Sequence, residues 1–206
     1  MERNGRAPRL SLRTVETAKI KVAMRHARSR PTLALALLCT IAAGGAAAQT
    51  RGAPLDLGPA QLAGDEASYL DLAVGTFGTR PSHLAPDAAS GLVELRYSRK
   101  LFGFGPALGV LGNTKGGIFG YAGVYSDVRL GDVVITPLAG IGGYHRGSGE
   151  DLGGAFEFRL GIGAAYEFSD RSRLGLRYGH ISNAGSHRIN PGDNELLVTY
   201  ALPLGF

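Results

Sequence analysis

Cysteine is almost absent from this sequence, since its 206 residues include one, Cys39. Cys39 lies in an N-terminal stretch that has the features of a secretory leader, described below. If that stretch is cleaved, the mature chain has no cysteine and therefore no disulfide bond. This composition suits an exported protein that does not depend on cross-links.

Long apolar runs are also missing from most of the chain. The apolar stretch LALALLCTIAAGG, which begins at Leu33, is too short to cross a bilayer as a helix. After it, no stretch approaches the roughly 18 consecutive apolar residues of a transmembrane helix. The carboxylates show no metal-ligand spacing, and no helical pattern follows the glycine-rich stretch at 109–117, so it is not interpreted as a phosphate loop.

The first 48 residues predict a secretory signal. Basic residues precede the apolar stretch, and small residues at Ala46 and Ala48 follow it. We expect cleavage after Ala48, which divides the chain into a leader, 1–48, and a mature part, 49–206, with Met24 as an alternative start. The leader holds nine basic and two acidic residues, which leaves 13 of the 22 basic and 15 of the 17 acidic residues for the mature part. The net charge of +5 therefore comes from the leader and does not indicate nucleic-acid binding.

Strict alternation of side-chain type dominates the mature part. Between Phe156 and Phe168 the even positions are apolar, whereas the odd positions carry charged or small residues. A strand of this length with one uniformly apolar face is typical of a membrane barrel wall. Comparable segments predict strands at 69–77, 91–98, 101–112, 117–130, 132–145, 155–168, 172–183 and 195–205.

These eight strands predict an all-β fold, an eight-stranded antiparallel up-and-down transmembrane β-barrel of the bacterial outer membrane. The count is even, and the expected connections alternate between short turns and mostly longer loops, as in such barrels. The C-terminal strand alternates apolar residues up to Phe206. This ending resembles the signature by which outer-membrane proteins are recognised for assembly, so the barrel assembly machinery is an expected partner. A soluble β-sandwich is the alternative fold.

The stretch YGHISNAGSHRINPGDNELL, residues 178–197, combines a histidine, a serine and downstream acids. His180 and Ser182 continue the apolar even row of strand 172–183, whereas Arg173 and Arg177 occupy its odd face. We therefore expect His180 and Ser182 to face lipid at the outer rim. Their side-chain bases would lie roughly 6–7 Å apart, within reach of a hydroxyl–imidazole hydrogen bond.

Two interpretations of this pair stay open on spacing alone. An ester hydrolase needs an activated hydroxyl, a base, a group that orients the base and donors for the oxyanion. His180, Ser182 and Glu195 supply the first three, and Asn183, Asn190 and loop N–H groups supply the donors. The alternative is an ordinary polar hairpin loop, because asparagine, glycine and proline are common turn residues.

The motif HISNAG, followed by NPGDNE just before the last strand, resembles the lipid A 3-O-deacylase (PagL) family. The resemblance covers the leader, the eight-stranded barrel and the motif on the penultimate strand. It implies that His180 is the general base, Ser182 the nucleophile and Glu195 the orienting acid. Asn190 is implied as an oxyanion contributor, together with the backbone near Asn183 and Ala184.

One departure from the family pattern concerns the acid. The interval from His180 to Glu195 is fifteen residues, one longer than is usual in the family. Glu195 also has an odd number in a strand whose apolar face is even, so strict alternation would turn it inward unless a bulge shifts the register. Asn194 and Asp193 are the alternatives to Glu195.

The resemblance implies an outer-membrane esterase that acts on lipopolysaccharide, with its site at the outer leaflet and no metal or organic cofactor. Lipid A and membrane lipid are then the expected partners, and a homodimer is left open. The competing functions are a non-enzymatic structural or adhesive barrel and a lipid A palmitoyltransferase-like barrel enzyme.

Overall fold

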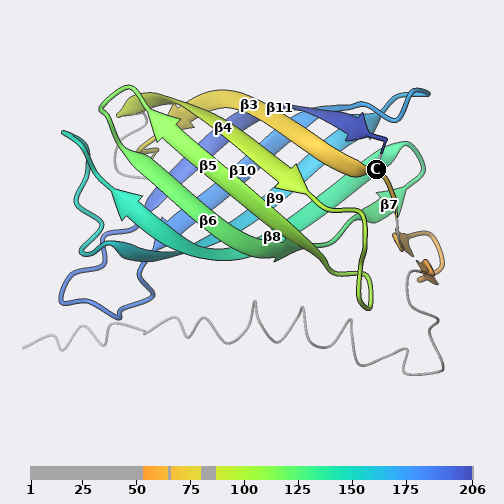
Figure 1. Cartoon of the computed structure of the whole chain (residues 1–206), viewed down its shortest axis with the longest axis horizontal. Coiled ribbons are helices and arrows are strands. Elements are labelled where there is room, and N and C mark those ends of the chain that lie inside the picture. Colours follow the sequence, from red (N-terminus) through yellow and green to blue (C-terminus); the bar gives the residue numbers. More distant parts are fainter. Residues whose placement is uncertain (1–52, 65, 80–86, 206) are drawn as a thin grey trace, which may run out of the picture. The chain divides into compact units, whose positions relative to one another are not determined.

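The computed structural model describes residues 53–64, 66–79 and 87–205, which all belong to the unit spanning Thr40–Phe206. The predicted leader and Phe206 lie outside the described residues. Eight strands form a closed antiparallel barrel (Figure 1): β3 (Ser68–Phe77), β4 (Ala88–Arg96), β5 (Gly105–Asn113), β6 (Ile118–Tyr125), β8 (Val133–His145), β9 (Phe156–Glu167), β10 (Arg173–Ser182) and β11 (Asp193–Leu204). Each strand pairs with the next, and the pairing of β11 with β3 closes the ring. The predicted fold class is confirmed.

Three short strands extend one end of this barrel. They are β1 (Leu55–Asp56), β2 (Gln61–Leu62) and β7 (Val128–Leu130), which pair in the order β1–β2–β7–β8. After β2, the Ala63 N–H donates a hydrogen bond to the Asp127 carbonyl, which fixes the entering chain against the barrel end. Among the described residues, no helix is long and apolar enough to span a membrane.

Two predicted strand boundaries are wrong. Residues 101–104, expected at the start of a strand, form a tight turn in which Phe102 and Gly103 have positive φ. The expected strand 117–130 is interrupted at Ser126–Asp127, where it divides into β6 and β7. At this interruption the side chain of Asp127 is buried and accepts hydrogen bonds from Thr136, at 2.6 Å, and from Lys100, at 3.2 Å.

The predicted assignment of strand faces holds in β10. Leu174, Leu176 and Tyr178 are half exposed on the outside of the barrel, whereas Arg173 and Arg177 are buried inside. Other strands expose valine, leucine, isoleucine and aromatic side chains in the same alternation. An outside that is apolar and an inside that is polar are what a barrel immersed in lipid requires.

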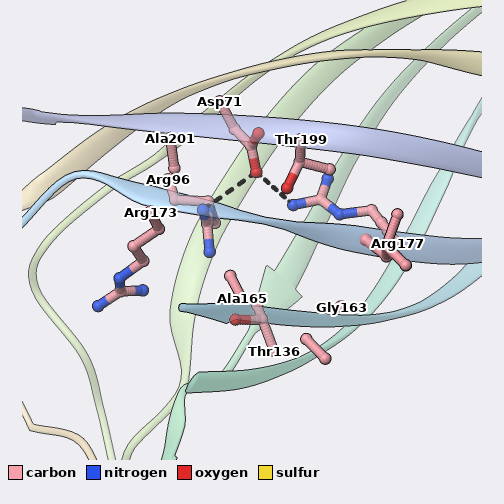
Figure 2. Close-up of a pocket in the computed structure, with 11 residues that line it drawn as sticks. Asp71, Arg96, Thr136, Gly163, Ala165, Arg173, Arg177, Thr199 and Ala201 are labelled. Atoms are coloured by element: carbon pink, nitrogen blue, oxygen red, sulfur yellow. Dashed lines mark hydrogen bonds and ion pairs between the residues drawn. The ribbon is translucent and has the colours of Figure 1, made fainter. Parts of the chain in front are cut away.

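Paired charges occupy much of the interior. Figure 2 shows Asp71 between two arginines, with distances from Oδ2 of 3.1 Å to Arg96 and 2.5 Å to Arg177. Arg177 also lies 3.0 Å from Glu94, which accepts a hydrogen bond from the Tyr121 hydroxyl. Because an eight-stranded barrel has room for side chains only, each buried charge must find its partner on another strand of the wall.

The same pairing continues to the end of the barrel that carries the short strands. Arg173 contacts Asp127 and Glu66, and Arg129 contacts Glu66 and Glu167. Burial by itself raises the pKa of Asp127, but the positive charges of Lys100, Arg96 and Arg173 outweigh it and hold the pKa well below its usual range. The carboxylate therefore stays ionised inside the protein.

The connections place the candidate motif at the other end of the barrel. The connections from β3 to β4, from β5 to β6, from β8 to β9 and from β10 to β11 start and end there. Connections 97–104, 126–132 and 168–172 lie at the end with the short strands. The loop 114–117 contacts 146–155, since the Ser148 N–H donates to the Lys115 carbonyl over 2.9 Å. His180 and Ser182 end β10 where it enters the loop 183–192.

We expect Asp71→Ala to lower the free energy of unfolding by about 3 kcal/mol, because it leaves two buried guanidinium groups without a shared partner. Arg146→Ala is the matched control, since its ion pair with Asp151 is more than half exposed. That change should cost no more than about 1 kcal/mol. Urea unfolding in lipid vesicles, followed by tyrosine fluorescence, measures both, and equal losses would contradict the role assigned to Asp71.

Candidate functional site

His180 and Ser182 lie on the outside of the barrel wall, as the alternation predicts. Both side chains are partly exposed at the end of β10. On the neighbouring strand β9, Leu160 is directly opposite His180 and Phe158 is directly opposite Ser182. Leu160 is 51% exposed and Phe158 is 36% exposed, so the polar pair borders an apolar outer surface.

The imidazole of His180 is held by the strand on its other side. In the register of β10 and β11, His180 is directly opposite Asn194, and the Cβ atoms of such pairs are about 5 Å apart. His180 Nδ1 lies 2.7 Å from Asn194 Oδ1. The Tyr178 hydroxyl donates to the same oxygen over 2.8 Å.

The amide of Asn194 has a defined orientation. Its Nδ2 donates to the Thr79 carbonyl over 2.7 Å, so its Oδ1 must be the atom that faces His180. An amide oxygen only accepts hydrogen bonds, so His180 carries its proton on Nδ1 when it makes this contact. His180 Nε2 is then the basic nitrogen, with its lone pair free to take a proton.

Glu195 does not contact His180, contrary to the role that the resemblance implies for it. Its side chain is fully buried inside the barrel, where Oε1 accepts a hydrogen bond from Arg159. Adjacent residues of a strand point to opposite sides of a sheet, so Asn194 faces outward and Glu195 faces inward. β11 pairs with both neighbours in unbroken register here, without the bulge that would turn Glu195 outward.

Two glycines give these side chains the space that they occupy. A Cβ on Gly179, directly opposite Glu195, would lie 2.7 Å from Glu195 Cγ. A Cβ on Gly192 would lie 2.8 Å from His180 Cε1 and 3.2 Å from Nε2. Gly192 also has a φ of +63°, which favours glycine. Gly192 therefore leaves the Nε2 edge of the imidazole uncovered.

The loop 183–192 is fixed mainly by Asn183. Its Nδ2 donates to the carbonyls of Leu152 and Ile189, over 2.7 and 2.8 Å, and its Oδ1 accepts from the Gly185 N–H. The side chain is fully buried. Asn183 thus joins two loops, and its amide is engaged with backbone rather than with the space beside Ser182.

Of the predicted oxyanion donors, the Asn183 N–H is already used in another hydrogen bond. The Asn183 N–H donates to Asn190 Oδ1 over 3.0 Å, so this backbone donor is engaged. The contact also turns the Asn190 amide so that its two N–H donors point away from Asn183. Ala184, exposed and at a φ of +53°, begins the turn immediately after Asn183.

The arrangement supplies a hydroxyl, an oriented base and an adjacent amide donor on a surface that is otherwise apolar. In the part of the chain that the structure describes, no hydrogen bond joins Ser182 to His180, and catalytic contacts of this type often shorten only when substrate is bound. Sequence reasoning missed Tyr178, Thr79 and Gly192. Tyr178 belongs to the apolar row, and Thr79 lies beyond a strand end, so neither carries a sequence signal for this role.

A comparison of the sequence with known families identifies the family to which the chain belongs. A family model described as Lipid A 3-O-deacylase (PagL) matches residues 89–203. A relative named Lipid A deacylase PagL, from Bordetella bronchiseptica, is 43% identical over 49 residues, which are 24% of this chain and 28% of that protein. The matched stretch thus spans less than a third of the relative's length.

A solved structure shares the architecture. It is described as the crystal structure of the outer membrane enzyme PagL, and it matches with a TM-score of 0.51 at 18% identity. The match covers 66% of this chain and 99% of that one. At this identity the likeness concerns the fold.

We expect Asn183→Asp to loosen the loop 183–192 as much as Asn183→Ala does. Aspartate keeps the acceptor for the Gly185 N–H but places a carboxylate oxygen against two carbonyls. Hydrogen exchange over 184–192 should rise about tenfold or more, in line with the loss of a buried hydrogen bond. Ser186→Ala, an exposed change in the same loop, should leave hydrogen exchange over 184–192 unaltered. If these amides stayed protected from exchange in Asn183→Asp, Asn183 would not be the residue that holds the loop.

Proposed function

Because the chain belongs to the lipid A 3-O-deacylase (PagL) family, a family of ester hydrolases, we propose that it removes the acyl chain ester-linked at position 3 of lipid A. The observation that carries this proposal is the position of His180 and Ser182. A polar pair on the outside of a membrane barrel is costly unless it serves a purpose. A lipid substrate in the same membrane provides that purpose.

The surface around the pair suits an acyl chain. Phe158 and Leu160 border it on β9, and Leu196 follows Asn194 along the outer row of β11. Phe156 and Phe158 contact each other edge to face, with ring centroids 5.3 Å apart. An acyl chain can lie along these side chains without leaving the hydrocarbon, so the site needs no deep pocket.

The reaction uses one molecule of water for each ester. The Ser182 Oγ attacks the ester carbonyl carbon while His180 Nε2 takes the hydroxyl proton. The bond from the carbonyl carbon to the sugar oxygen then breaks, and His180 returns its proton to that oxygen. Water attacks the acyl-Ser182 ester by the same route, which releases the fatty acid and restores the serine.

The carbonyl oxygen becomes negatively charged in each attack and needs donors. The Asn190 amide is the proposed side-chain donor, since its Oδ1 is engaged by the Asn183 N–H and its Nδ2 remains available. The Ala184 N–H is the proposed backbone donor. Removing one such donor typically lowers kcat by about 10² to 10³.

The family and the barrel fold identify an outer-membrane protein. We place the end with loops 78–87, 114–117, 146–155 and 183–192 at the outer surface, since longer loops are external in such barrels. His180 and Ser182 then lie at the level of the outer leaflet, where lipid A resides. The substrate reaches the site by lateral diffusion.

We expect Ser182→Ala and His180→Ala each to lower deacylation by at least about 10³-fold, because each removes a group that the chemical step requires. Mass spectrometry of lipid A from cells that express each variant measures the loss of one 3-hydroxyacyl chain. Ser186→Ala provides the control, since it removes another serine hydroxyl from the adjoining loop. The altered mobility of the folded barrel on unheated gels shows that each variant has folded.

The same spectra distinguish the competing functions. Addition of an acyl chain would assign the protein to acyl transfer, and unchanged lipid A would favour a structural barrel. Full activity in a folded Ser182→Ala variant would overturn the proposed nucleophile.

A further inference from the structure

We propose that Asn194, a neutral amide, is the positioning residue for His180, so that this chain works with a Ser–His–Asn arrangement in place of a carboxylate-based triad. The inference rests on the proposed hydrolase function. It concerns how the base is oriented.

The first support is the number of contacts that hold Asn194. Its backbone carbonyl accepts from the N–H groups of Gly78 and Thr79, over 3.0 and 3.3 Å, and its side-chain Nδ2 donates to the Thr79 carbonyl. The two residues that follow β3 thus fix Asn194 through three hydrogen bonds. Tyr178 and His180 then share the remaining acceptor, Oδ1.

The second support is the tautomer that these contacts select. An asparagine beside a catalytic histidine can present either its oxygen or its nitrogen, and presenting the nitrogen would force the wrong tautomer. Here the Thr79 carbonyl takes the nitrogen, so the oxygen faces His180 Nδ1. The amide therefore orients the base as a carboxylate would, but without a negative charge.

The third support is the distribution of charge around His180. On the outside, the groups next to it are Tyr178, Asn194 and Ser182 on β10 and β11, Leu160 and Phe158 on β9, and Gly192 in the loop, all uncharged.

Charged groups on β9 and β11 at the same level of the barrel, Glu157 among them, point into the interior. Glu195 is paired with Arg159, and both are fully buried. Asp193 is also buried, and its Oδ1 accepts from the Asn194 N–H. A neutral partner stabilises a protonated imidazole less than a carboxylate does.

The experiment compares pH profiles of kcat/KM for the full-length protein in detergent micelles, with purified lipid A as substrate. Asn194→Ala should lower kcat about 10²-fold with KM within about twofold, because it releases the imidazole without altering the lipid-binding surface. Asn194→Asp should retain more activity than Asn194→Ala. It should also move the acidic limb of the profile upward by about one pH unit or more, because it places a negative charge beside His180.

Glu195→Gln tests the competing assignment. We expect this variant to unfold more readily, since it removes the buried partner of Arg159, and its acidic limb should coincide with that of the unmodified protein. A shifted acidic limb of the pH profile in Glu195→Gln, together with an unshifted acidic limb in Asn194→Asp, would overturn the proposal and assign the orientation of His180 to Glu195. So would full activity in Asn194→Ala.

The outcomes separate this inference from the function on which it rests. Activity that disappears in Ser182→Ala but persists unaltered in every Asn194 variant would remove Asn194 from the site and leave the hydrolase intact. Lipid A that the unmodified protein does not deacylate would instead remove the proposed function itself. Since a merely structural defect in Asn194→Asp would lower activity at every pH, the position of the acidic limb distinguishes orientation from folding.

Discussion

The pairing of buried charges inside the barrel is the interaction on which the remaining features depend. Eight strands enclose too little space for water-filled channels, so side chains fill it, and many of those side chains are charged. Asp71 joins Arg96 to Arg177, and farther along the axis Arg159 pairs with Glu195. The contact of Asp71 with Arg96 joins the neighbouring strands β3 and β4. The contacts of Asp71 with Arg177 and of Arg159 with Glu195 join strands that are not neighbours, β3 with β10 and β9 with β11. The wall is thereby held in a single register, and it is this register that sets His180 opposite Asn194.

Neighbouring residues of β11 have different roles: Glu195 stabilises the interior, and Asn194 belongs to the outer site. Glu195 contributes its charge to the interior, where Arg159 requires a partner, and it is therefore separated from His180 by the thickness of the wall. Asn194 precedes Glu195, and because successive side chains of a strand point to opposite faces, Asn194 faces outward. Lipid is a poor environment for a lone charge, and a neutral amide costs less there than an unpaired carboxylate. The outer site is accordingly built from hydroxyl, imidazole and amide groups.

Much of this arrangement could be predicted from the amino-acid sequence, because the alternation of apolar and polar residues shows which side chains of a strand face lipid and which face the interior. It predicted the eight strands, the inward arginines of β10 and the outward pair formed by His180 and Ser182. It also indicated that Glu195 would point inward. The short strands β1 and β2 could not be predicted, since two residues carry no periodicity. The hydrogen bond from Asn194 to the Thr79 carbonyl could not be predicted either, because it joins positions 115 residues apart and depends on barrel closure.

Because His180 lies directly opposite Asn194, the charge beside the histidine depends on the register between β10 and β11, which the loop 183–192 connects. If β11 slid by a single position, every side chain on it would change faces. A one-residue insertion or deletion in 183–192 that shifted β11 in this way would exchange an amide for a carboxylate beside the histidine, and it would also turn the apolar face of β11 inward. A sequence alignment that closes such a gap to match acid with acid would conceal the difference.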